Sequence, residues 1–142
     1  MRRILFTMAA LSLAPLSAPA GDLSPGLWEI SMETRVPATP EFAPPPVRRT
    51  QCLHTEDARD PTSLLGEIST AGATGCSYSE KTYSGNTFSF VMQCSGTYAL
   101  QSRGQVTYTA ETAEGRITST ANLGGAAVQT ENTLSARRVG GC

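Results

Sequence analysis

The chain has 142 residues, of which 39% are hydrophobic and 6% aromatic, and its formal net charge at pH 7 is −1. This balance argues against nucleic acid as a partner, because binding to phosphate backbones needs a basic face and an excess of positive charge. The length is enough for one domain with a modest core and too short for two ordinary domains.

The first 20 residues have the pattern of a secretory signal peptide. Arginines at positions 2 and 3 give a positively charged start, residues 4–16 are apolar, and Ala18-Pro19-Ala20 is a small-residue cleavage site. The apolar run is too short to span a bilayer, and no later segment approaches the roughly 20 apolar residues of a membrane helix. We therefore expect a single mature domain, residues 21–142, that is periplasmic or secreted and has no membrane span.

Residues 26–36 alternate apolar and polar side chains, as a half-buried strand does. Trp28, Ile30 and Met32 occupy apolar positions, with charged or hydroxyl residues between them. The proline-rich residues 37–46 that follow predict an ordered surface crossing without a strand.

Residues 48–53 can resume a strand, and one or two short helical turns should follow near residues 55–66. Thr55 is the expected cap of the first turn. Asp60 and Pro61 are typical of the start of a second, because the aspartate side chain caps the turn and proline fits its first position.

After a small, polar loop at residues 66–75, residues 76–94 predict a hairpin. If the chain reverses through the three-residue loop Ser84-Gly85-Asn86, Cys76 falls opposite Cys94. The same register pairs Tyr78 with Met92, Glu80 with Phe90, and Thr82 with Phe88. The side chains expected to face the core, or a ligand, across the whole chain are Trp28, Ile30, Met32, Tyr78, Phe88, Phe90 and Met92.

The rest of the chain is rich in Thr, Val and Tyr and predicts four further strands. They are expected at residues 97–103, 105–111, 116–123 and 127–138, separated by Gly104, residues 113–115 and residues 124–125. Seven or eight antiparallel strands joined in sequence order predict an all-β fold, a strongly curved meander that is a half-open or a closed barrel.

Four cysteines in an exported chain allow three disulfide pairings. The hairpin register favours Cys76 with Cys94, which leaves Cys52 with Cys142 by elimination. The competing pairing, Cys52 with Cys76 and Cys94 with Cys142, stays open at this point. A structural role is favoured over a catalytic one, because the chain has no Cys-x-x-Cys pair.

Several stretches together resemble a family of small exported bacterial proteins known as domain of unknown function 3617. They are the residues PGLWEI at 25–30, the proline-rich crossing, QCLHTEDARDP at 51–61, GNT at 85–87, CSG at 94–96 and RVGGC at 138–142. The resemblance covers essentially the whole mature chain and implies an exported protein of the family's fold, but no activity, substrate or catalytic residues. The chain departs from the family pattern at His54, where proline is common, and at Gly141, where an acidic residue is common.

No motif indicates an enzyme, so the leading hypothesis is a non-enzymatic exported protein that binds a small apolar ligand or another exported protein through its curved sheet. The alternative is a hydrolase or isomerase that uses the single histidine, His54, with Glu56 and Asp57. These residues and Asp60 could also form a metal site. The start of a helix favours negative charges such as those of Glu56 and Asp57, and Asp60 is expected to cap a turn. Structural roles are therefore favoured for these residues, and no metal or cofactor is expected.

Overall fold

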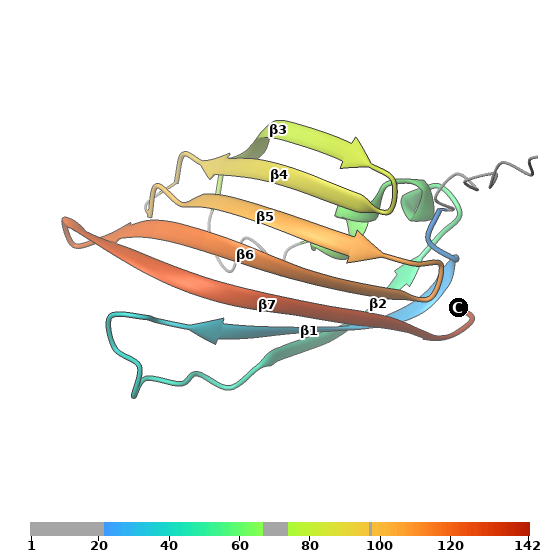
Figure 1. Ribbon diagram of the computed structural model, residues 1–142, viewed down its shortest axis with the longest axis horizontal. Coiled ribbons are helices and arrows are strands. Elements are labelled where there is room, and N and C mark those ends of the chain that lie inside the picture. The colour runs from blue at the N-terminus through green and yellow to red at the C-terminus, as the bar shows by residue number, and fades with distance from the viewer. Residues whose placement is uncertain (1–21, 67–73, 97) are drawn as a thin grey trace, which may run out of the picture.

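The computed structural model describes residues 22–66, 74–96 and 98–142 (Figure 1). The predicted signal peptide and most of the loop predicted at residues 66–75 lie outside these ranges. The described elements are β1 (Gly26–Arg35), β2 (Val47–Leu53), the 3-10 turns η1 (Asp57–Arg59) and η2 (Pro61–Leu64), β3 (Cys76–Ser84), β4 (Thr87–Cys94), β5 (Gln101–Tyr108), β6 (Thr112–Leu123) and β7 (Ala126–Gly140). The prediction of an all-β fold with short helical turns after β2 is confirmed.

All seven strands form one antiparallel sheet in the order β2-β1-β7-β6-β5-β4-β3 (Figure 1). From β3 to β7 each strand pairs with the next, as in the predicted meander. The hairpin of β1 and β2 joins the far side of this meander, because β1 also pairs with β7. As a result β2 and β3, which follow one another along the chain, are the two edges of a curved sheet that does not close into a barrel.

The β3–β4 hairpin has the predicted register only near the cysteines. Cys76 lies opposite Cys94, but the register shifts by one residue between Tyr78 and Glu80, so that Ser79 is an extra residue in β3. The Ser79 hydroxyl donates a hydrogen bond of 3.3 Å to the Val91 carbonyl oxygen. Such a β-bulge reverses which side chains face inward beyond it.

The pairing predicted beyond the bulge, and the three-residue loop, are therefore wrong. Lys81 rather than Glu80 lies opposite Phe90, and Tyr83 rather than Thr82 lies opposite Phe88. The turn itself has two residues, and Gly85 has a φ of 58°. Glycine at the first central position is what a tight two-residue hairpin turn favours, and this turn chemistry sets the register of the neighbouring pairs.

Gly104 was expected to separate two strands and instead lies in the middle of β5, opposite both Phe90 and Ile117. A Cβ atom at this position would lie 2.7 Å from the Phe90 ring and 2.9 Å from Ile117. The glycine is thus a packing residue rather than a turn residue. The predicted break at residues 113–115 is wrong for a related reason, since β6 runs through Gly115, where a Cβ atom would lie 2.7 Å from Val106.

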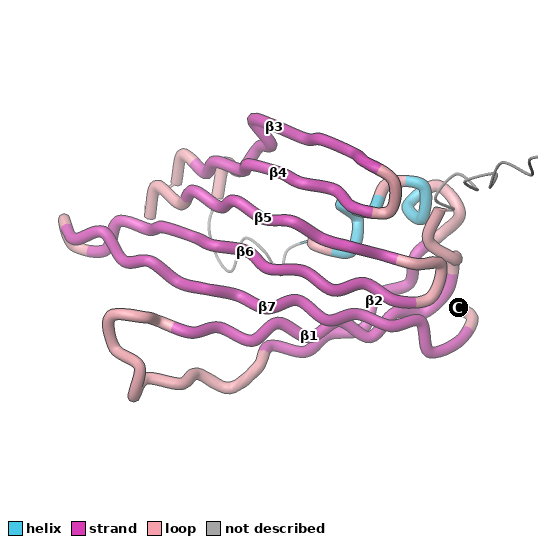
Figure 2. Tube along the Cα trace, viewed as in Figure 1, coloured by secondary structure: helices cyan, strands magenta, loops and turns pink. Residues whose placement is uncertain are grey.

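The core lies on the concave face of the sheet. Inward side chains from six strands pack with Leu23 and with apolar residues of the 3-10 turns into one cluster. Its largest fully buried members are Trp28, Phe88, Phe90, Leu23, Ile30, Leu53, Leu64, Leu65, Leu134 and Val106. The 3-10 turns lie toward the end of the sheet that holds the carboxyl terminus (Figure 2), so they cover the core where β2 and β3 leave the sheet open.

Candidate functional site

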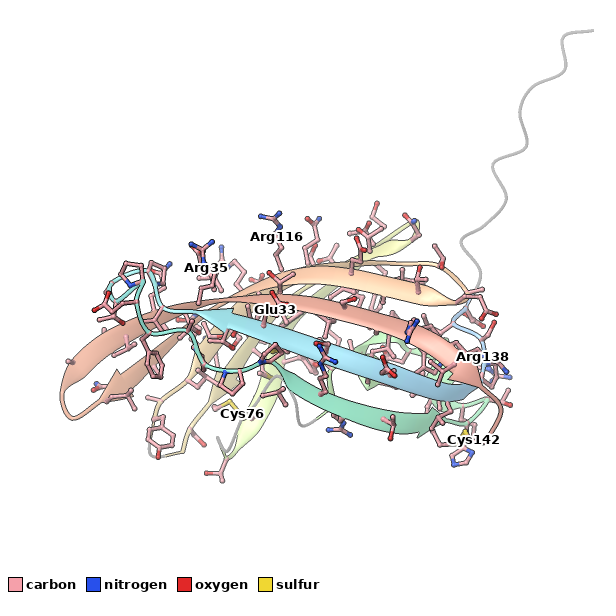
Figure 3. All side chains as sticks on the ribbon, turned by 90° about the horizontal axis from the view of Figure 1, so that it is seen from below. Glu33, Arg35, Cys76, Arg116, Arg138 and Cys142 are labelled. Carbon is pink, nitrogen blue, oxygen red and sulfur yellow. A yellow bond between two sulfur atoms is a disulfide. The ribbon has the colours of Figure 1, made fainter. Side chains whose placement is uncertain are left out.

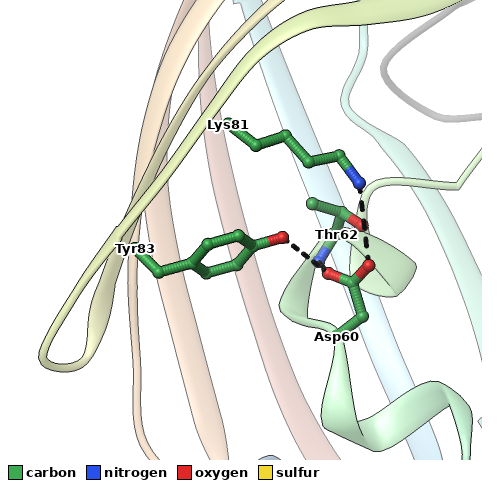
Figure 4. A network of polar contacts seen from close by, with 4 residues as sticks. All are labelled: Asp60, Thr62, Lys81 and Tyr83. Carbon is green, nitrogen blue, oxygen red and sulfur yellow. Dashed lines mark hydrogen bonds and ion pairs between the residues drawn. The ribbon is translucent and has the colours of Figure 1, made fainter.

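The segment after β2, residues 54–66, contains η1 and η2 and bridges the open side of the sheet; it is called the strap below. On one side the Gln51 side chain in β2 donates a hydrogen bond of 3.1 Å to the Ser63 carbonyl oxygen. On the other side Asp60 contacts β3 (Figure 4). The strap thus joins the two edge strands, which no backbone pairing connects within the described residues.

Asp60 is the centre of the contacts on the β3 side (Figure 4). Its Oδ1 accepts hydrogen bonds from the Thr62 backbone at 3.0 Å and from the Tyr83 hydroxyl at 3.1 Å. The Lys81 ammonium lies 3.7 Å from its Oδ2 and 4.6 Å from the centre of the Tyr78 ring. The bond to Thr62 is the expected cap of η2, and the bulge at Ser79 turns Lys81 and Tyr83 toward it.

This arrangement changes the acidity of three groups. Partial burial favours the neutral form of Asp60, but the hydrogen bonds from Thr62 and Tyr83 and the charge of Lys81 outweigh it, so its pKa lies below 3.8. Burial, together with the negative charge of Asp60, raises the pKa of both Tyr78 and Tyr83. The Tyr83 hydroxyl therefore stays protonated at neutral pH and donates to an ionised carboxylate, and this bond ties the strap to β3.

The residues expected to face the core or a ligand lie on the concave face. Trp28, Ile30, Met32, Phe88, Phe90 and Met92 are buried, and Tyr78 is partly buried against the same cluster. The Trp28 indole N–H donates to the Ser24 carbonyl oxygen at 2.9 Å, and Tyr78 packs edge-on against Phe90 with ring centres 5.7 Å apart. These side chains are covered by the protein itself.

Toward the other end of the concave face the inward side chains are polar, which the sequence did not reveal. Ser102 and Ser119 are buried and lie 2.8 Å apart through their hydroxyl oxygens. Asn132 donates to the Ile117 carbonyl oxygen at 3.1 Å, and its Oδ1 accepts from the Thr34 hydroxyl at 2.8 Å. Within the described ranges every buried side-chain nitrogen or oxygen has a hydrogen-bond partner, so this network is internally satisfied.

The free edge of β2 differs from that of β3. The pairing of β2 with β1 is regular, and no other strand pairs with β2 among the described residues. Arg48 and Arg49 are adjacent on this edge; Arg49 donates to Gln51 at 3.3 Å, while Arg48 is exposed and has no ion pair in the described part of the chain. Val47, which precedes them in β2, is 56% exposed, and Phe42, in the crossing before β2, is 60% exposed. The edge therefore offers backbone hydrogen bonds, positive charge and apolar surface together.

The residues of the alternative catalytic hypothesis have other partners. The Asp57 carboxylate accepts a hydrogen bond of 3.1 Å from the His54 backbone N–H, and Glu56, which precedes η1, makes no side-chain cap bond. Thr55 is thus not the cap that was expected, because Asp57 reaches back to the chain from inside the turn. The described residues contain no group of three or more His, Cys, Asp or Glu side chains that could hold a metal.

Both disulfides have the favoured pairing. Cys76 and Cys94 link β3 to β4, and Cys52 and Cys142 link β2 to the end of the chain, with no free cysteine among the described residues. The competing pairing is thereby excluded. The Cys52–Cys142 bond lies at an open hollow of about 270 Å³ that His54 also lines. Two disulfides indicate an oxidising environment, and the described ranges hold no helix long and apolar enough to cross a bilayer.

The outer face of the sheet carries a second feature that sequence reasoning missed. Three neighbouring open hollows, of about 430, 440 and 330 Å³, are all lined by Arg116. Arg35 projects from the same side of the sheet (Figure 3). The hollows also contain Glu80, Glu114 and Glu131, so opposite charges are mixed there and no single sign dominates.

The fold and the disulfides show which class of protein this chain belongs to. It is a small all-β protein with a curved, open antiparallel sheet, two disulfides and a helical strap across its opening. The chain belongs to the family described as protein of unknown function (DUF3617), whose sequence model matches residues 23–142. No curated protein and no solved structure matches the chain.

Proposed function

We propose that this protein is a non-enzymatic, periplasmic or secreted binding protein that adds an extended acidic segment of another exported protein to the free edge of β2. The observation that carries the proposal is the contrast between the two sheet edges. A strand with unpaired backbone groups binds an extended partner by continuing the sheet, while neighbouring side chains select its sequence.

The β3 edge has two features that oppose such pairing. It contains the bulge at Ser79, and its lysine Lys81 points inward to Asp60. Bulges and inward charges are devices that protect sheet edges. The described part of β2 has no bulge, since its register with β1 is unbroken. Its inward-facing arginine, Arg49, lies opposite Ile30 and donates to Gln51 of the same strand.

The charge on β2 selects the kind of partner. Two copies of this edge pairing with one another would bring Arg48 and Arg49 of both chains together, and like charges opposite each other destabilise a strand pair. A segment with acidic side chains is attracted by these arginines, whereas a second copy of the same edge is repelled by them. The exposed Val47 supplies an apolar contact on the same edge.

The small apolar ligand that the sequence also allowed has weaker support. The inward apolar residues are already covered, with Trp28 and Ile30 both 0% exposed. The four open hollows described above are lined by neither residue. A ligand on this face would have to displace core side chains, which a close-packed interior resists.

A matched pair of short synthetic peptides tests the proposal, one alternating valine with glutamate and the other valine with lysine. The glutamate peptide should bind, with nuclear magnetic resonance shifts concentrated in β2, and the lysine peptide should not. The double variant Arg48→Glu/Arg49→Glu should reverse this preference, while Arg103→Glu on β5, as a control, should leave it unchanged. Shifts centred on β3, or a preference that ignores the double variant, would refute the proposal.

A further inference from the structure

The two disulfides of this protein differ in how accessible they are. Cys94 is only 5% exposed, and it bonds to the partly buried Cys76. Cys142 is exposed and bonds to the partly buried Cys52 at the mouth of an open hollow. An attacking thiolate must approach a sulfur atom directly, so the hollow gives access to the Cys52–Cys142 bond.

A histidine lies beside the sulfur of Cys52, which is the less exposed of the two cysteines. The Nδ1 atom of His54 is 4.0 Å from the Sγ atom of Cys52. The backbone of His54 is fixed on both sides, because its N–H donates to Asp57 at 3.1 Å and its carbonyl oxygen accepts from Ala58 at 3.0 Å. The strap thereby fixes the backbone position from which the exposed ring reaches the sulfur.

We propose that Cys52–Cys142 is a thiol–disulfide exchange site at which His54 stabilises the leaving thiolate. The co-reactant is an external dithiol, either a small molecule or the reduced form of an exported dithiol protein. This inference does not depend on the proposed binding at β2.

The exchange runs in two balanced steps. A thiolate of the dithiol attacks the Sγ of the exposed residue Cys142, the Cys52–Cys142 bond breaks, and Cys52 leaves as a thiolate that accepts a hydrogen bond from Nδ1–H of His54. The second thiol of the dithiol, as a thiolate, then attacks the dithiol's own sulfur in the mixed disulfide and forms a bond with it. Cys142 leaves as a thiolate, both cysteines end reduced, and the dithiol ends as a disulfide.

The geometry gives each sulfur a distinct role. Cys142 is the more exposed of the two and faces the attacking group, while Cys52 has the hydrogen-bond donor beside it. A leaving thiol departs faster when its thiolate is stabilised, and a neighbouring imidazole does so by hydrogen bonding or by charge. Exchange would release the end of the chain from β2 and leave the β3–β4 hairpin closed.

The experiment exposes the oxidised full chain to limiting glutathione or dithiothreitol, traps free thiols by alkylation and maps them by mass spectrometry. The Cys52–Cys142 bond should open first, and glutathione should be found on Cys142. His54→Ala should slow this opening about three- to tenfold. Thr55→Ala, which changes a neighbour lining the same hollow, should not.

Two readouts separate the role of His54 from exposure alone. If the Cys52–Cys142 bond of His54→Ala opens at the wild-type rate, accessibility alone explains the reactivity of this bond and the assigned role of the histidine is wrong. If the two disulfides open together, or glutathione is found mainly on Cys52, the exchange site itself is refuted. Circular dichroism of each oxidised variant verifies that the fold is intact before the rates are compared.

Discussion

Ser79 determines which side chains of β3 meet the strap. Because it is an extra residue in the strand, Lys81 and Tyr83 face inward and reach Asp60. The sequence revealed the cap formed by Asp60 and Pro61, since that pair is a local signal. It did not reveal the bulge, because a bulge depends on how the turn and the partner strand match, and hydrophobic alternation alone does not record this.

Asp60→Ala should destabilise the protein, because it removes the cap of η2 and the contacts to β3 together. We expect a loss of about 1 kcal/mol in the free energy of unfolding, most of it from the cap, since an exposed ion pair such as that with Lys81 contributes little. Urea denaturation at neutral pH measures it. Glu56→Ala is the control, because Glu56 makes no side-chain cap bond, and an equal loss in both variants would contradict this account of Asp60.

The difference in stability between the wild type and Asp60→Ala should depend on pH, and the direction in which folding shifts the pKa of Asp60 determines how. The pKa of Asp60 in the folded protein is lowered from 3.8, so its ionised form stabilises the fold above that value. The contribution is lost as the pH falls through the folded-state pKa. The stability gap between the wild type and Asp60→Ala should therefore narrow at pH values below 3.8, and a gap that widens there would have the wrong sign.

At the scale of single elements, the strands were predictable where side chains alternate and less so where glycine occurs inside them. β1 and β4 show clear alternation and lie where expected. From the sequence alone Gly104 predicts a break between two strands, because glycine in isolation favours turns. A larger residue does not fit at position 104 because the Phe90 ring of the neighbouring strand occupies the space. This contact exists only in the assembled sheet. The part of the chain around Gly104, where two strands were expected, is the single strand β5. The sheet therefore has seven strands, the lower of the two expected numbers.

Gly104→Ala tests this reading of β5. The added methyl group would lie 2.7 Å from the Phe90 ring, so the ring must move, and overpacking of this kind costs about 1–3 kcal/mol. Gly140→Ala is the matched control, because Gly140 also lies in a strand and a Cβ atom there has nothing within 4 Å. Thermal and urea unfolding should show a large loss for the first variant only, and similar losses in both would mean that strand geometry rather than packing restricts these positions.

At the scale of the whole molecule, an open sheet is held in shape by a strap and two disulfides. The bond between Cys52 and Cys142 spans 90 residues of sequence and that between Cys76 and Cys94 spans 18. Both pairings could be predicted, because hairpin symmetry identified one and elimination the other. The pairing of β1 with β7 could not, since nothing local in either strand specifies a partner so distant in sequence.

The candidate site is a product of this global arrangement. Only the strand order shows that β2 is an edge, so Arg48 and Arg49 in isolation gave no sign of a binding surface. His54 was noticed as a possible catalytic or metal-binding residue, but its position beside the Cys52 sulfur depends on the strap. Sequence reasoning therefore identified the chemical groups, while the structure supplied their neighbours.

Hydrogen–deuterium exchange of the free, monomeric protein tests most directly the central claim that β2 is an available edge. In an edge strand about every second amide points away from the only partner strand, so amides alternating along Val47–Leu53 should exchange far faster than those of β7, which is paired on both sides. Uniform protection along β2, as slow as that in β7, would mean that the edge is already covered, and would contradict the account.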